Sequence, residues 1–319
     1  MNKEQADIIS KHILANNIAK LESNDFIRFI TSTTVGYIPS RLVDYFIETG
    51  NFQFNGKDLK FSEGIDGFDQ KSVSIDKVNS AMVEAGAIKE KPSHFAHEER
   101  AVGDQDRLVN PEFRINRAYD FVLGLQVDAV SLQISTTING EHLLILQKRG
   151  GNVVASGKLD STASGAVKYP EKNFVEALSN QLDHEVGKNF SKLSANAVFG
   201  ASIYLSLSLN KNGIPAVQRI RKGLYDLHVD EETANQILTQ STEEAETFQF
   251  ATPSEIIDLC CDETIPPVLV QSFMTSLIVT GLMPKSDFTS HIKSVLQENG
   301  GCMIVEKPKG IKPSKGLCP

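Results

Sequence analysis

A loop that contains glycine and leads into an amphipathic helix, at residues 157–187, constrains the fold more than any other segment of this chain. Gly165 and Glu171 lie in the loop, and apolar periodicity predicts a helix over residues 173–186. Three side chains of this helix share one face: Gln181, His184 and Glu185. Carboxylates on such a face can converge on a hard cation. The same residues also fit an ordinary solvated helix face. The sequence of the upstream loop is therefore needed to choose between a cation site and a solvated surface.

The segment resembles the Nudix box, a strand–loop–helix element that hydrolyses diphosphates by clustering carboxylates around Mg²⁺. Gly165 and Glu171 have the spacing of the first glycine and glutamate of the box, and one additional residue follows before the helical part. Glu185 is the one helical glutamate that is retained. Three box positions are altered: Asn180 replaces arginine, and Gln181 and His184 replace glutamates. The resemblance is therefore stronger for the fold than for the activity.

The resemblance extends over residues 25–285. The patterns QKR at 147–149 and GKLD at 157–160 are similar to those of Nudix proteins close to isopentenyl-diphosphate isomerase. Further short motifs, among them VGYIP at 35–39 and GLYDL at 223–227, occur in the same order in a Nudix group with an extra N-terminal domain. In fungi that group is fused to thiamine pyrophosphokinase. Its fused members are associated with removing phosphate from oxidised thiamine diphosphate analogues.

The resemblance implies a hydrolase of a small organic diphosphate that uses Mg²⁺ or Mn²⁺, with thiamine diphosphate derivatives as favoured substrates. The residues that it implies for catalysis are Glu185, Gln181 and Glu244. Those that it implies for the metal are Glu185, Glu171, His184 and Glu244. Those that it implies for substrate phosphate are Lys148, Arg149 and Gly165.

The altered positions keep an alternative open. The neutral amide of Gln181 can coordinate through its carbonyl oxygen but cannot act as a base, and His184 suits softer ions such as Mn²⁺ or Zn²⁺ better than Mg²⁺. The alternative is a catalytically inactive Nudix-fold protein that binds a nucleotide, a diphosphate or a protein partner. An isomerase of isopentenyl diphosphate ranks below both, because that chemistry usually needs an early cysteine and the first one here is Cys260.

Strands that alternate with helices and hairpins predict the α/β class, with a mixed sheet between helices. The resemblance makes this a Nudix α/β/α sandwich at residues 116–285, preceded by a smaller α+β domain at 1–115. Asn139-Gly140 predicts the turn of the first hairpin. A C-terminal helix and a flexible tail rich in lysine and proline are expected over 286–319.

The net charge of −8 argues against a nucleic-acid partner, because no basic surplus is available for phosphates. A membrane partner is not expected either, since no apolar run approaches the ~20 residues that span a bilayer. The start of the chain lacks the apolar core of a signal peptide, and the four cysteines form no CxxC pair. A cytoplasmic location is therefore expected. The resemblance adds a small-molecule diphosphate as ligand and a homodimer as an option.

Overall fold

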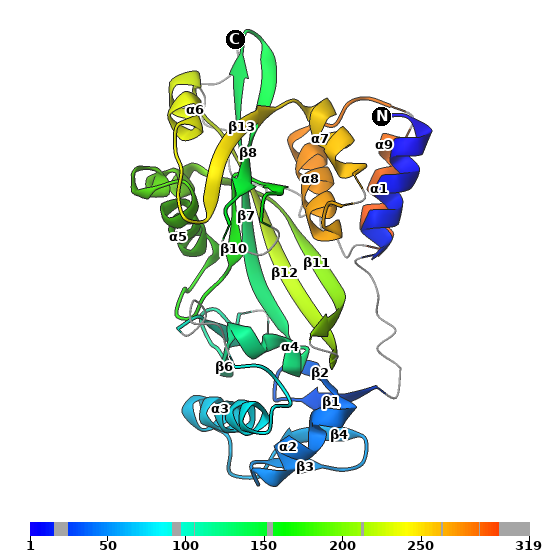
Figure 1. Ribbon diagram of the computed structural model, residues 1–319, viewed down its shortest axis with the longest axis vertical. Coiled ribbons are helices and arrows are strands. Elements are labelled where there is room, and N and C mark those ends of the chain that lie inside the picture. The colour runs from blue at the N-terminus through cyan, green and yellow to red at the C-terminus, as the bar shows by residue number, and fades with distance from the viewer. Residues whose placement is uncertain are drawn as a thin grey trace.

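The structure is a computed structural model of the 319-residue chain, and it describes residues 1–15, 25–90, 97–104, 106–151, 156–211, 214–262, 264–286 and 288–299. A long sheet lies between two groups of helices, and a smaller module of strands and helices lies at one end of that sheet (Figure 1). The expected flexible tail includes residues 300–319, which lie outside the described residues.

The central sheet has seven strands, of which five follow the order β11-β12-β7-β8-β13. Their bounds are β7 Gln126–Ile138, β8 Glu141–Arg149, β11 Val198–Lys211, β12 Ile214–His228 and β13 Ala245–Ala251. Two short strands complete it: β9 (Leu159–Asp160) pairs with β8, and β10 (Ala163–Ala166) pairs with β7. Strands β7 and β12 are parallel, whereas the other pairs are antiparallel. The predicted mixed sheet is confirmed.

Helices cover both faces of this sheet (Figure 1). One face packs against α5 (Phe174–Glu185) and α6 (Glu231–Leu238). The 3-10 segment Lys188–Asn196 contributes Phe190 to the same core. The other face packs against α7 (Pro253–Cys260) and α8 (Pro267–Thr280), and α9 (Thr289–Asn299) packs against α8 in the same core. The α/β/α sandwich predicted from the sequence is therefore confirmed, and α9 is the expected C-terminal helix.

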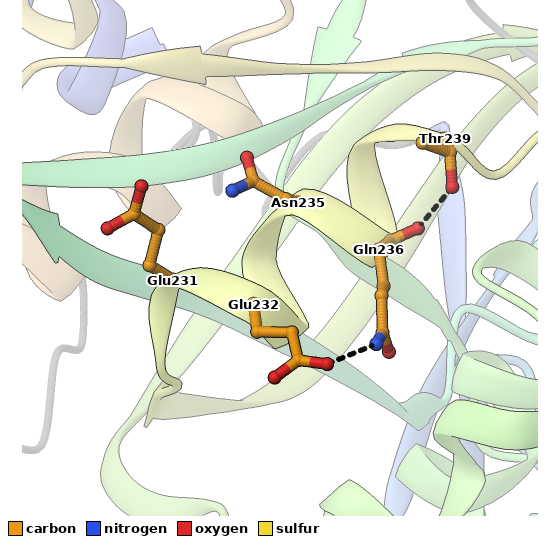
Figure 2. Close-up of a pocket in the computed structure, with 5 residues that line it drawn as sticks. All are labelled: Glu231, Glu232, Asn235, Gln236 and Thr239. Carbon is orange, nitrogen blue, oxygen red and sulfur yellow. Dashed lines mark hydrogen bonds between the residues drawn. The ribbon is translucent and has the colours of Figure 1, made fainter.

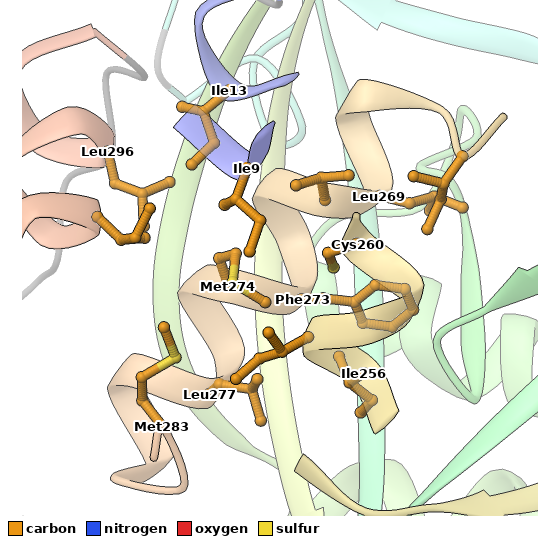
Figure 3. Packing of buried hydrophobic residues seen from close by; sticks show 14 of the residues in the cluster. Ile9, Ile13, Ile256, Cys260, Leu269, Phe273, Met274, Leu277, Met283 and Leu296 are labelled. Carbon is orange, nitrogen blue, oxygen red and sulfur yellow. The ribbon is translucent and has the colours of Figure 1, made fainter. Parts of the chain in front are cut away.

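Helix α1 (Lys3–Ala15), which the expected domain at 1–115 includes, packs in the core of the larger domain. Its apolar residues Ala6, Ile9 and Ile13 are fully buried against α8 and α9 in the core of the larger domain (Figure 3). Ser10 also lies within hydrogen-bonding distance of His291 on α9, at 3.1 Å. The apolar stripe of α1 thus completes a layer formed by the opposite end of the described chain.

The N-terminal module contains a four-stranded sheet of order β2-β1-β4-β3 and the two-stranded sheet β5-β6. Its bounds are β1 Phe26–Ile30, β2 Val35–Pro39, α2 Val43–Glu48, β3 Phe52–Phe54, β4 Asp58–Phe61, α3 Phe68–Glu84, β5 Glu99–Val102 and β6 Phe113–Asn116. Phe29, Phe46 and Phe52 pack ring against ring in its core. That core continues through α4 (Asp120–Leu123) to Ile214 on β12. The two domains therefore share apolar contacts across the expected boundary at residue 115.

Among the helices of the described residues, none is both long and apolar enough to cross a bilayer.

Candidate functional site

Helix α5 holds the box residues against the sheet. Ala177, Leu178 and Leu182 are fully buried in the core that the helix shares with β7 and β12. The Asn173 side chain caps the N-terminus by accepting a hydrogen bond from the Glu176 backbone N–H at 2.9 Å. The helix predicted over 173–186 is confirmed, and its C-terminal end lies beside the end of β8.

Glu185 lies at that end, buried between β8 and the box loop, and is only 3% exposed. Its Oε2 accepts hydrogen bonds from Gln147 Nε2 and from the Ser164 backbone N–H, both at 2.8 Å. Burial raises the pKa of Glu185 to about 8, with further contributions in the same direction from the charges of Asp160 and Glu244. At neutral pH this carboxyl group is therefore mostly protonated.

Asp160 on β9 is a site residue that was not predicted, although the GKLD pattern contains it. It is 2% exposed, and its Oδ2 lies 2.5 Å from Arg149 Nη1. Its Oδ1 accepts a hydrogen bond from the Ser161 backbone N–H at 2.7 Å. Arg149, which was expected to contact phosphate, therefore neutralises a buried carboxylate of the protein itself.

Lys222 on β12 places a second cation near these carboxyl groups, and no sequence motif identifies it. The residue is buried, and its Nζ lies 3.4 Å from Ser272 Oγ on α8. Burial lowers the pKa of Lys222, while the charges of Asp160 and Glu185 act in the opposite direction. Arg149 and Lys222 together place protein cations around carboxyl groups that the Nudix scheme would place around a metal.

Gln181 occupies a packed position beneath the loop. The residue is 5% exposed, and its Nε2 lies 3.5 Å from the Ala166 carbonyl oxygen. A Cβ atom added at Gly165 would lie 2.2 Å from Gln181 Oε1, far inside van der Waals contact. A larger residue at 165 would therefore require the Gln181 amide to move, so the loop and the amide fit each other without a ligand.

Both carboxylate oxygens of Glu171 accept hydrogen bonds, one from the helix and one from the loop. Oε1 accepts a hydrogen bond from Asn180 Nδ2 at 2.7 Å, and Oε2 accepts one from the Lys168 backbone N–H at 2.5 Å. Burial raises the pKa of this carboxyl group. Asn180, which stands where the box has arginine, thus fastens the loop to α5 by a hydrogen bond rather than by an ion pair.

The remaining predicted site residues are spread around this core. His184 is exposed on the outer side of α5. Glu244 is half-buried in the turn before β13, and its charge reaches Glu185. Its carbonyl oxygen accepts a hydrogen bond from the Gly150 backbone N–H at 2.8 Å. Lys148 forms a surface ion pair with Glu246 at 3.0 Å.

These positions do not fit a resident Mg²⁺ or Mn²⁺ ion. Within the part of the chain that the structure describes, no group of three or more histidine, cysteine, aspartate or glutamate side chains could hold a metal. Mg²⁺ requires a near-octahedral set of oxygen ligands. Here both carboxylate oxygens of Glu171 and one of Glu185 already accept hydrogen bonds from the protein. The predicted ligands are therefore not gathered into a metal centre.

A shallow hollow lies away from the box helix, on the exposed side of α6 (Figure 2). Its lining comes from that helix and from the residue that follows it: Glu231, Glu232, Asn235, Gln236 and Thr239. Gln236 Nε2 donates a hydrogen bond to Glu232 Oε1 at 3.4 Å, and Thr239 Oγ1 donates one to the Gln236 carbonyl oxygen at 2.8 Å. These groups bond to one another, so the hollow adds no chemistry to the site.

No family model matches the chain, and no curated protein does. The solved structures that resemble it include an Ap4A hydrolase from C. elegans, with 15% identity and a TM-score of 0.29 over 49% of this chain and 98% of that one. The Nudix domain of Shewanella oneidensis NrtR, complexed with ADP ribose, has 7% identity and a TM-score of 0.32 over 47% and 86%. RenU, a Nudix hydrolase from M. smegmatis, has 14% identity and a TM-score of 0.28 over 50% and 88%.

Proposed function

We propose that this chain is a Nudix-type protein that binds a small organic diphosphate without hydrolysing it. One observation carries the absence of hydrolysis: the box positions that would hold a cation have structural partners instead. The diphosphate ligand is what the sequence resemblance implies. Glu185 accepts hydrogen bonds from Gln147 and Ser164, and Glu171 accepts them from Asn180 and Lys168. A cation at Glu185 Oε2 or at either oxygen of Glu171 would therefore compete with these bonds.

The chemistry of the altered residues supports the same conclusion. The amide of Gln181 is neutral and buried, so it cannot remove a proton from water. Loss of general-base assistance typically lowers a rate by about 10²–10⁴. The raised pKa of Glu185 favours its protonated form, and the His184 side chain is exposed. Glu185 is thus the one carboxyl group that remains among the three helix positions 181, 184 and 185.

Hydrolysis with Mg²⁺ or Mn²⁺ is the second candidate, and a specific observation favours it. Asp160, Glu185 and Glu244 interact electrostatically at one end of α5, and carboxyl groups with strongly perturbed pKa values concentrate at functional sites. In this candidate Glu185 and Glu244 take the catalytic roles. The substrates are the thiamine diphosphate derivatives that the sequence resemblance implies.

Thermal unfolding with and without a chelator separates the two candidates. Thiamine diphosphate and its oxidised analogues are expected to raise Tm equally in EDTA and in Mg²⁺ or Mn²⁺, because binding to the folded state requires no metal. Thiamine, which lacks the diphosphate, is the matched control ligand and is expected to leave Tm unchanged. A rise in Tm that requires Mg²⁺ or Mn²⁺ would contradict binding without a metal. No rise with any diphosphate would reject this ligand class in favour of a protein partner.

A further inference from the structure

Two exposed histidines lie near each other on the sheet, separated by one strand. His142 is on β8 and His228 is on β12, and β7 runs between them. In the strand register His142 is opposite Thr137, and His228 is opposite Ser135. Their ring centres are 6.3 Å apart, with the rings inclined at 67°.

The strand between them holds both rings by their Nδ1 atoms. Thr137 Oγ1 lies 3.1 Å from His142 Nδ1, and Ser135 Oγ lies 3.2 Å from His228 Nδ1. When Nδ1–H donates to such an oxygen, Nε2 carries the lone pair that a metal can bind. Hydrogen bonds of this kind, made by the ring nitrogen that does not bind the metal, fix the tautomer and orientation of metal-binding histidines.

We propose that His142 and His228 form a site for a divalent transition-metal ion that prefers nitrogen ligands, such as Zn²⁺, Cu²⁺ or Ni²⁺. Imidazole binds these ions well, whereas Mg²⁺ prefers oxygen ligands. Water completes the coordination shell, because both rings are exposed. Burial and the nearby His142 ring lower the pKa of His228, which favours the neutral form that binds metal.

The spacing of the rings is compatible with one shared ion. A metal–nitrogen distance of about 2.1 Å puts each ring centre roughly 3.2 Å from the ion, so two rings that share it lie no more than about 6.4 Å apart. A tetrahedral angle at the ion brings the ring centres to about 5 Å. The observed 6.3 Å therefore has to shorten by about 1 Å, which exposed side chains achieve by small rotations.

This site is separate from the box residues. His142 lies on the same face of β8 as Leu144 and Leu146, which pack in the core with α8. Gln147, the partner of Glu185, lies on the opposite face of that strand, toward α5. The proposal therefore goes beyond the proposed function, and the failure of one would leave the other intact.

Zn²⁺ titration of the full chain without a histidine tag tests the proposal, with Cu²⁺ electron paramagnetic resonance as a second probe. We expect one Zn²⁺ per chain, with affinity reduced at least about tenfold in His142→Gln and in His228→Gln. The Cu²⁺ spectrum is expected to show two nitrogen ligands and to lose one in each variant. Ser135→Ala, which keeps both rings, is expected to weaken Zn²⁺ binding by a smaller factor.

His97→Gln is the matched control, because His97 is also exposed but lies outside the pair. Its Zn²⁺ affinity is expected to equal that of the unaltered protein. Circular dichroism checks that each variant is folded. Zn²⁺ binding that survives both pair substitutions would overturn the proposal, as would the absence of Zn²⁺ binding by the unaltered protein at millimolar concentration.

Discussion

Replacing Asp128 with asparagine is expected to lower the free energy of unfolding by about 3–5 kcal/mol, because the change removes a buried negative charge that is bonded to two arginines. Asp128 on β7 is 3% exposed and lies between two arginines. Its Oδ1 accepts hydrogen bonds from Arg107 Nη2 and Arg221 Nε, both at 2.7 Å, and its Oδ2 accepts one from Arg221 Nη2 at 3.0 Å. Asparagine keeps the shape of the side chain but cannot neutralise either guanidinium group.

Asp58→Asn is the matched control for this prediction. Asp58 also pairs with an arginine at 2.7 Å, but the Arg28 side chain is 44% exposed. Exposed pairs contribute about 1 kcal/mol or less, so the control is expected to lose no more than that. Urea unfolding at pH 7, followed by circular dichroism because the chain has no tryptophan, measures both values. Equal losses of unfolding free energy in the two variants would contradict a larger contribution from the buried contacts of Asp128 with Arg107 and Arg221.

Raising the pH from about 5 to about 8 is expected to destabilise the folded protein through Glu185. Its pKa is about 8 in the folded state, above the ordinary value of 4.5, so the folded state retains a proton that the unfolded state has released. This contribution to stability is fully present below pH 4.5 and is lost as pH rises through 8. Through this one group, the free energy of unfolding falls by at most about 1.4 kcal/mol per pH unit.

Glu185→Gln isolates this effect. Glutamine resembles the protonated acid and can still accept hydrogen bonds from Gln147 and Ser164 through Oε1. Urea unfolding of both proteins at pH 5 to 8.5 gives the difference between them, in which other titrating groups cancel. We expect the variant to lose less stability as pH rises. Parallel pH profiles would mean that Glu185 is ionised in the folded protein.

The local elements were predictable because their signals are local. The cap at Asn173 and the apolar spacing of Ala177, Leu178 and Leu182 define α5 without any tertiary information. Asn139 has a positive φ of 51° and Gly140 one of 81°, the backbone that an Asn-Gly hairpin turn requires. The order of strands and helices then predicted the sandwich.

The partners of these elements were not predictable, because they depend on residues distant in sequence. The apolar stripe of α1 indicates an amphipathic helix but not that it packs against α9, near the opposite end of the described chain. The GKLD pattern contains Asp160 but does not place it in a cluster with Glu185, and no motif identifies Lys222. The resemblance to the Nudix box identified Glu171 and Gln181 as site residues. It did not predict the hydrogen bonds of Glu171 or the packing of Gln181 against the loop.

Release of phosphate or monophosphate from thiamine diphosphate and its oxidised analogues is the measurement that tests this interpretation of the box most directly. The unaltered protein and Glu185→Gln are compared side by side, each with Mg²⁺ and with Mn²⁺. We expect no turnover above that of the variant with either ion, because the box positions are engaged in structural contacts. Turnover that is present in the unaltered protein and disappears in Glu185→Gln would contradict binding without hydrolysis and establish a hydrolase with an altered box.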